Sequence, residues 1–149
     1  MNCVIVCVGS DKISGDSLGP LVGSMLREGG VPCPVYGYLG KTVNGVNLDE
    51  YRRFLRRYHP FVPIIAVDAA VGNADEIGQI KYRLGGVQAG GAVGRSAPPL
   101  GDLAVLGVVG QKGGDVLASL LSVPYPEVEA LAHKIVDRIL DVLGRLEAA

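Results

Sequence analysis

The sequence has no tryptophan, few histidines and no excess of charge of either sign. Its 14 basic and 15 acidic residues give a formal net charge of -1, so the composition offers no attraction for nucleic acid or an anionic membrane surface. No segment has the roughly 20 consecutive apolar residues that a membrane span needs, and the first residues lack the basic region and cleavage site of a secretion signal. We therefore expect a cytoplasmic protein whose partner is a protein, a peptide or a small molecule.

Cysteine is also scarce, and the three cysteines make an odd number. Cys3 and Cys7 lie four residues apart in an apolar segment, where a strand points both side chains in the same direction, and Cys33 follows later. We expect buried, reduced thiols. The two histidines, His59 and His133, are too few and too distant in the chain to form a zinc cluster with them, and we expect both at the surface. The residues predict no metal and no cofactor.

The rest of the composition is typical of one folded domain over residues 1–149. Hydrophobic residues make up 48% of the chain and charged residues only 19%, which excludes a disordered protein. The 22 glycines have no three-residue period, so they indicate tight turns and not a fibre. A chain of this length buries roughly two-thirds of its unfolded surface and can therefore form a core.

Apolar runs and helical periodicities alternate along the chain. Continuous apolar runs, typical of strands buried on both faces, cover residues 3–8, 35–39, 61–67 and 103–109, and a less apolar strand at 78–84 is expected at an edge. Helical spacing predicts four helices. The first begins near Pro20, the second follows Asn47, which is expected to cap it, and the others cover 112–121 and 126–146. In the last helix, the residues expected to face the core are Val128, Leu131, Ile135, Ile139, Val142 and Leu146. The alternation implies right-handed crossovers, and so an α/β fold: a three-layer α/β/α sandwich with a mostly parallel central sheet.

Two acidic residues follow inner strands of this predicted sheet. Asp16 lies in the loop between the first strand and the first helix, and Asp68 comes directly after the strand at 61–67. Ligand sites in such sheets lie beyond the carboxyl ends of the strands, so both residues are expected at the same edge. Two carboxyl groups held close together can act as acid and base or bind a cation. Helix capping by Asp16 and loop hydrogen bonding by Asp68 explain the same pattern without a function.

Other polar residues have simpler interpretations. Asp115 is expected to cap a helix, and Asp102 to lie at the opposite edge of the sheet from Asp68 if its strand is parallel. Ser14 and Ser17 lie near Asp16 but have no basic partner, which argues against a catalytic triad. The second helix carries four arginines opposite its apolar stripe, where we expect a solvated face: Arg52, Arg53, Arg56 and Arg57.

The stretch 85–101 holds six glycines and two prolines in 17 residues. It is too interrupted for a regular element and longer than an ordinary connection inside a compact domain. Such loops often border a binding site. We therefore expect this loop to lie beside the substrate cleft.

Three segments resemble a known family: 8–20, with the sequence VGSDKISGDSLGP, 65–70, with IAVDAA, and 98–102, with PPLGD. In these segments, and over nearly the whole chain, the sequence is similar to the YyaC-type sporulation proteins. That family is related to the spore germination protease and, more distantly, to the endopeptidases that trim hydrogenase large subunits. The resemblance implies a three-layer α/β fold and catalytic roles for Asp16 and Asp68. The hydrogenase-processing enzymes add a histidine that recognises nickel, and the stretch 108–111 contains none.

These observations lead to one principal functional hypothesis and two alternatives. The principal hypothesis is a sporulation-associated peptidase in which Asp16 and Asp68 activate water and protonate the leaving amine of a protein or peptide substrate. The first alternative is a catalytically silent binding or assembly protein that keeps the ancestral cleft. The second is a metal bound by the same two aspartates and by water. Self-association of the chain stays open.

Overall fold

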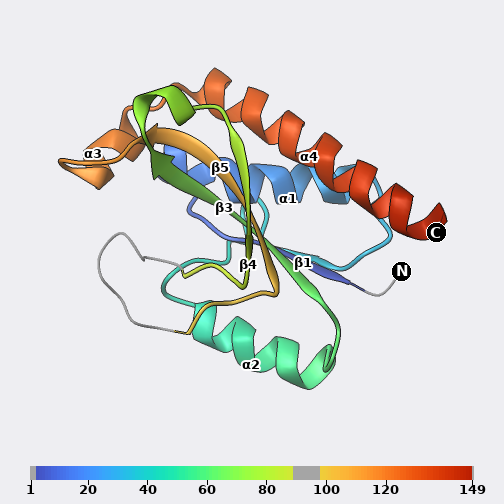
Figure 1. The fold of residues 1–149 in the computed structure, drawn as a ribbon. Coiled ribbons are helices and arrows are strands. Elements are labelled where there is room, and N and C mark those ends of the chain that lie inside the picture. Colours follow the sequence, from blue (N-terminus) through green and yellow to red (C-terminus); the bar gives the residue numbers. More distant parts are fainter. Residues whose placement is uncertain (1–2, 89–97, 149) are drawn as a thin grey trace.

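The computed structural model describes residues 3–88 and 98–148. Figure 1 shows strands and helices alternating along the chain. The strands are β1 (Val4–Cys7), β2 (Val35–Tyr36), β3 (Ile64–Gly72), β4 (Ile80–Leu84) and β5 (Leu103–Gln111). The helices are α1 (Leu18–Glu28), α2 (Leu48–Tyr58), α3 (Val116–Leu121) and α4 (Tyr125–Ala148), with short 3-10 turns η1 (Gly15–Ser17) and η2 (Ala74–Glu76).

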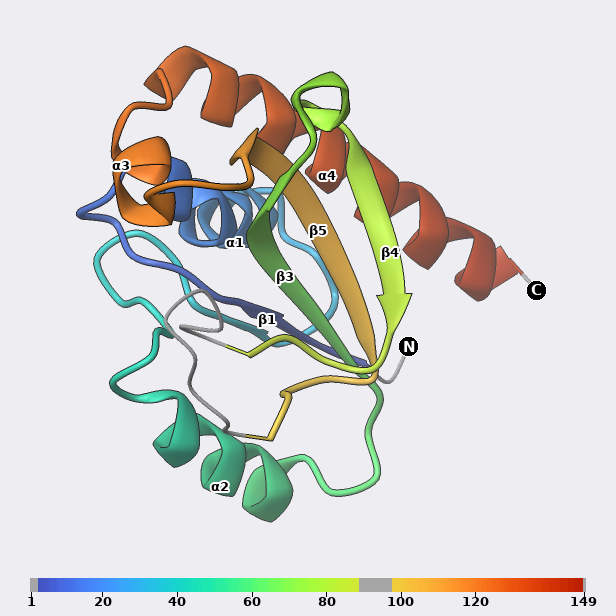
Figure 2. The same ribbon diagram turned by 60° about the vertical axis from the view of Figure 1, so that its left-hand side comes forward.

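The strands form one five-stranded sheet in the order β2-β1-β3-β5-β4. The pairs β1 with β2, β1 with β3, and β3 with β5 are parallel, whereas β4 runs antiparallel to β5 at the edge (Figure 2). The predicted mostly parallel α/β fold and the edge position of the strand near residues 78–84 are therefore confirmed.

Helices cover both faces of the sheet, which makes three layers (Figure 1). Helices α1 and α4 pack on one face, where their apolar side chains form a core with Ile5 and Val67 of the inner strands. Helix α2 packs on the other face, where Leu48 and Leu55 contact a second core that includes Ala66. Each inner strand alternates its side chains between these two cores, which is why its sequence is continuously apolar.

Several strand boundaries differ from the predicted ones. The strand predicted at 61–67 begins only at Ile64 and continues to Gly72, so Asp68 lies within β3 and not in a loop after it. The reason is long-range pairing, because β5 also extends beyond its predicted end and holds β3 in an extended conformation as far as Gly72. The strand predicted at 35–39 ends at Tyr36, because Gly37 turns the backbone with a φ of 90°.

Three helix predictions also need correction at their ends. Helix α1 begins at Leu18, so Pro20 lies within the first turn, where its missing N–H is not needed. Asn47 precedes α2 but does not cap it, because its Oδ1 accepts from the Asn44 amide at 2.8 Å and its Nδ2 donates to the Thr42 carbonyl at 2.9 Å. The helix predicted at 112–121 begins only at Val116, after two glycines with positive φ.

The C-terminal helix presents most of the predicted residues to the core. Val128, Leu131, Ile135 and Ile139 are buried, but Val142 is 40% exposed and Leu146 is 58% exposed. Leu143 is buried in their place, because it follows Ile139 by four residues and continues the same helical stripe. No helix within the described ranges, α4 included, combines the length and the hydropathy needed to cross a membrane.

Candidate active site

The connection between β1 and α1 is closed by two glycines, and it carries Asp16. A Cβ at Gly9 would lie 2.1 Å from the Asp16 carbonyl oxygen, and a Cβ at Gly19 would lie 2.1 Å from the Val8 carbonyl oxygen. Both distances are far below a normal contact, so only glycine permits this close approach. The start of α1 therefore rests directly against the end of β1, which places Asp16 beside the sheet.

Polar side chains hold the same connection in place. The Ser14 hydroxyl donates to the Val123 carbonyl, and the Ser17 hydroxyl donates to the Ser14 carbonyl at 2.6 Å. The Ser10 amide donates to the Asp16 carbonyl at 3.1 Å. Both serine hydroxyls are thus hydrogen-bonded to the backbone, which gives them a structural role in fixing η1.

Asp68 lies at the point where β3 extends beyond the end of β1. Cys7 pairs with Val67, and the Val8 amide donates to the Val67 carbonyl at 2.8 Å, which is the last of these pairings. Asp68 is the next residue and pairs only with Leu106 on β5. The turn η1, which includes Asp16, contacts β3. The prediction that Asp16 and Asp68 meet at the same edge of the sheet therefore agrees with the fold, although Asp68 reaches that edge from within a strand.

The electrostatics of the two carboxyl groups differ. Burial raises the pKa of Asp16 to about 6, partly opposed by the Ser10 amide. Burial also raises the pKa of Asp68 well above its usual range, and the negative charge of Asp16 raises it further. The Ala69 amide, which donates to Asp68 Oδ1 at 2.8 Å, opposes this shift, as does the positive charge of Arg83. Both carboxyl groups therefore ionise less readily than isolated aspartates, and ionisation of Asp16 opposes ionisation of Asp68.

Taken as whole residues, Asp16 and Asp68 are each intermediate in exposure. When one of two carboxyl groups in a site is protonated and the other is ionised, the first can donate a proton and the second can accept one in the same reaction.

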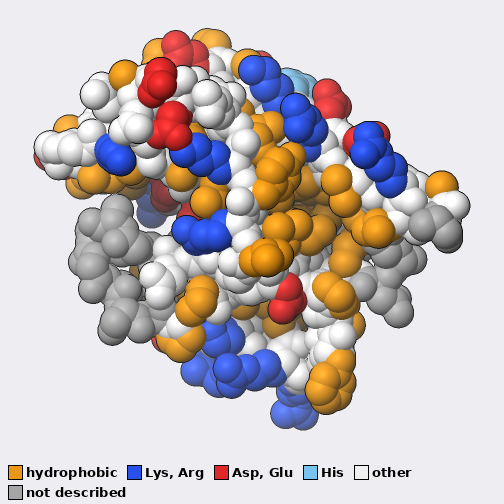
Figure 3. Space-filling view, viewed as in Figure 1, with side chains coloured by type: hydrophobic (Ala, Val, Ile, Leu, Met, Phe, Trp, Pro, Cys, Tyr) orange, Lys and Arg blue, Asp and Glu red, His pale blue; other side chains and the backbone are white. Residues whose placement is uncertain are grey.

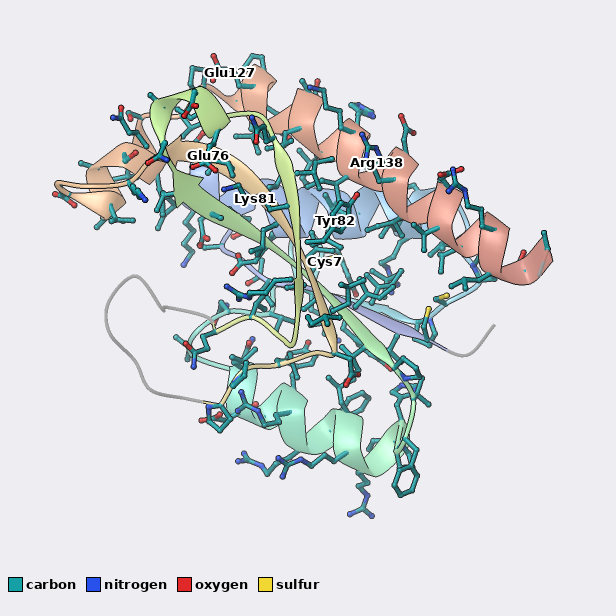
Figure 4. All side chains as sticks on the ribbon, viewed as in Figure 1. Cys7, Glu76, Lys81, Tyr82, Glu127 and Arg138 are labelled. Atoms are coloured by element: carbon teal, nitrogen blue, oxygen red, sulfur yellow. The ribbon has the colours of Figure 1, made fainter. Side chains whose placement is uncertain are left out.

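Arg83 was not anticipated from the sequence as part of the site. It pairs with Ala104 on β5 and lies on the same sheet face as Asp68, with its guanidinium donating to the Gly86 carbonyl at 2.9 Å. Lys81 lies on this face too, but it forms an ion pair with Glu76, and Figure 4 shows the two side chains pointing toward each other. No motif marks Arg83, because its position depends on the pairing of β4 with β5.

The remaining acidic candidates have structural roles. Asp102 Oδ2 accepts from the Ile64 amide at 2.8 Å, at the amino end of β3, so its predicted place at the opposite edge from Asp68 is confirmed. The Asp115 side chain accepts from the Ala118 amide at 3.2 Å and caps α3, as predicted.

The cysteines and histidines lie apart from the aspartate pair. All three cysteines are buried, as predicted, and the Sγ atoms of Cys3 and Cys33 lie 3.1 Å apart, within hydrogen-bonding distance. His133 is exposed, as predicted, and His59 is half-buried, with its Nε2 2.7 Å from the Tyr36 hydroxyl. Within residues 3–88 and 98–148, no three or more His, Cys, Asp and Glu side chains are grouped so as to hold a metal ion.

The base of the 85–101 loop lies on the sheet face that Asp68 shares. Val87 and Leu100 exchange backbone hydrogen bonds of 2.9 and 2.8 Å, and both are buried in the core under α2. Ala66 faces this core, and Asp68 follows it by two residues in the strand, so both residues lie on the same face of the sheet. The middle of the predicted binding loop, residues 89–97, lies outside the described residues.

The chain is similar to a known protein family over most of its length. A family model described as "Protein of unknown function (DUF1256)" matches residues 1–138. The chain belongs to the DUF1256 family. The "Uncharacterized protein YyaC" of Bacillus subtilis (strain 168) is 36% identical over 111 residues, which are 74% of this chain and 54% of that protein. This DUF1256 chain thus spans about half the length of the curated relative it matches, and the predicted YyaC-type relationship is confirmed.

Solved structures with the same fold include two hydrogenase maturation proteases. The [NiFe] hydrogenase maturation protease HycI from Thermococcus kodakarensis KOD1 has a TM-score of 0.58 and 22% identity, covering 96% of this chain and 92% of that one. The protease HybD from Thermococcus kodakarensis has a TM-score of 0.57 and 16% identity, covering 95% and 99%. An uncharacterized protein from Wolinella succinogenes has a TM-score of 0.60 and 17% identity, covering 98% and 99%. The DUF1256 chain therefore has a peptidase-like fold.

Proposed function

We propose that this DUF1256 protein hydrolyses a peptide bond in a protein substrate with Asp16 and Asp68 as its catalytic pair. The observation that supports this most is the position of Asp16 and Asp68 at the carboxyl edge of the sheet, where burial raises the pKa of both carboxyl groups and the charge of Asp16 raises that of Asp68 further. The peptidase-like fold supports the reaction class. The sporulation role belongs to the same proposal and rests on the resemblance described above. The cytoplasmic location is also part of the proposal and rests on the sequence features described above.

We assign a role to each aspartate from the pKa shifts of the two carboxyl groups. Ionised Asp16 takes a proton from a water molecule as that water attacks the carbonyl carbon of the scissile bond. Protonated Asp68 gives its proton to the leaving amine when the carbon–nitrogen bond breaks. Asp16 ends the cycle protonated and Asp68 ionised, and exchange with solvent restores the starting state. Arg83 stabilises the ionised form of Asp68 that this step produces.

The test is cleavage of a peptide library by the wild type and by single Asn variants, read by mass spectrometry. We expect D16N and D68N to lose at least about a hundredfold in rate, since general acid–base groups contribute roughly 10²–10⁴-fold. D141N is the matched control and should retain full activity, because Asp141 forms only an exposed pair with Arg145 on α4. The wild-type rate should rise with pH as Asp16 ionises near its pKa of about 6.

Two outcomes would reject this mechanism. Absence of cleavage by the wild type would favour the silent binding protein, and full activity in both Asn variants would exclude the aspartate pair. A chelator such as EDTA tests the metal alternative, because a metal held by the two aspartates requires loss of activity that added metal restores. We expect no effect of the chelator.

A further inference from the structure

A hollow lies at the amino end of β3, at the opposite end of this strand from Asp68. It has a volume of about 780 Å³ and lies between α2, the turn from α2 to β3, and the segment that leads into β5. Its walls include Arg52, Arg56, Phe61, Pro98 and Pro99. Neither Asp16 nor Asp68 lines it, so the groove is separate from the proposed peptidase site.

Phe61 is the most unusual residue of this groove. It is 104% exposed, so its ring is not packed against the rest of the protein. Among the described residues other than glycine, it is also the one with a positive φ, at 63°. Both features are unfavourable, because a left-handed conformation strains a residue with a Cβ and the ring leaves its apolar area in water. Glycine would fit this turn with less strain, and an exposed aromatic ring is available to a partner.

The charged walls of the groove are mainly positive. The Arg52 guanidinium is fixed by Asp49 and by the Pro98 carbonyl, and its buried Nε has no hydrogen-bond partner in the described part of the chain. Arg56 is exposed and forms no ion pair with any residue in the described ranges. The acidic wall residue, Asp102, already accepts a hydrogen bond from the Ile64 amide. In Figure 3 the Lys and Arg side chains gather over α2 at the bottom of the view.

We propose that this groove binds an acidic segment of a partner protein, anchored by an apolar side chain. The anchor would pack against the Phe61 ring and the proline walls, and a carboxylate beside it would pair with Arg56. Charge complementarity selects the acidic segment. A peptide fits better than a nucleic acid, because the groove is walled by apolar prolines and the chain has a net charge of -1. This inference does not depend on the reaction at Asp16 and Asp68.

The probe for this proposal is a fluorescein-labelled 12-residue peptide in which Glu alternates with Leu and Phe, compared with a copy in which Gln replaces every Glu. Fluorescence anisotropy with the full chain should show that the Glu peptide binds at least about tenfold more tightly, a difference that shrinks as added salt screens the charges. R56Q should weaken binding about tenfold. The matched control is R53Q, which removes the same charge from α2 at a residue that does not line the groove, and it should change binding less than about twofold.

The variant F61G tests whether the Phe61 ring contacts the peptide, and its thermal midpoint shows whether any loss of binding comes from unfolding instead. It should weaken binding about tenfold or more while its thermal midpoint stays equal to or above that of the wild type, because glycine tolerates the positive φ. Three results would overturn the proposal: no binding of the Glu peptide, equal losses in R53Q and R56Q, or unchanged binding in F61G. Tighter binding of a 12-nucleotide single-stranded RNA than of the Glu peptide would assign the groove to nucleic acid and would overturn it too.

Discussion

At the scale of single residues, Asp16 combines a proposed catalytic role with a cost to stability. Its pKa is about 6 in the folded chain against 3.8 for the unperturbed group, so the folded state holds the proton more tightly than the unfolded state does. The stability that depends on this proton is fully present below pH 3.8 and is lost as the pH rises through about 6. At neutral pH, the ionised Asp16 therefore destabilises the fold.

D16N should remove this cost. The shift in pKa corresponds to at most about 3 kcal/mol, and the partial exposure of Asp16 reduces the expected gain to about 1–2 kcal/mol at neutral pH. Urea unfolding near pH 7.5 should show that gain, and near pH 4 most of it should vanish because the wild-type carboxyl is then largely protonated. The exposed D141N variant serves as the control. A loss of stability of the same size at both pH values would show that Asp16 is held by interactions other than those described.

At the scale of elements, the position of Asp16 depends on how closely α1 approaches β1. G19A should destabilise the protein by about 3–5 kcal/mol or prevent folding, because the new Cβ would meet the Val8 backbone, which cannot rotate away as a side chain can. G144A is the matched control, since Gly144 lies within α4 where an added Cβ would have no neighbouring atom within 4 Å, and it should gain about 0.5–1 kcal/mol. Denaturant unfolding measures both. A G19A protein as stable as the wild type would contradict the close contact.

The elements also show how far local sequence can predict this fold and where it fails. The alternation of apolar runs predicted the layers, and the rule for parallel sheets predicted that Asp16 and Asp68 share an edge. The length of β3 beyond Asp68 was not predictable, because the small residues Ala69 and Ala70 have no strong strand signal and their extension depends on pairing with β5. Phe61 was assigned to a strand because it starts an apolar run. Its left-handed conformation has no sequence signal when the residue is not glycine.

At the scale of the whole molecule, β3 connects the proposed peptidase site to the proposed docking groove. Ile64 lines the groove and Asp68 belongs to the aspartate pair, and four residue-to-residue steps along the extended strand place them about 13 Å apart. The two regions share no hydrogen bond or ion pair within the described ranges, and side chains at such a distance usually act independently. We therefore expect the two ends of the strand to be energetically uncoupled.

The double variant D16N/F61G tests this independence. F61G alone should gain about 0.5–1 kcal/mol, because relief of the left-handed strain of roughly 1–2 kcal/mol exceeds the added chain entropy of glycine in the unfolded state. Combined with D16N near pH 7.5, the gains should add to within about 0.5 kcal/mol in urea unfolding. D16N should also leave the affinity for the Glu peptide unchanged, and F61G should leave the pH dependence of the D16N effect unchanged. A coupling energy above about 1 kcal/mol would mean that β3 transmits strain between its ends, so that a partner in the groove would alter the protonation of the aspartate pair.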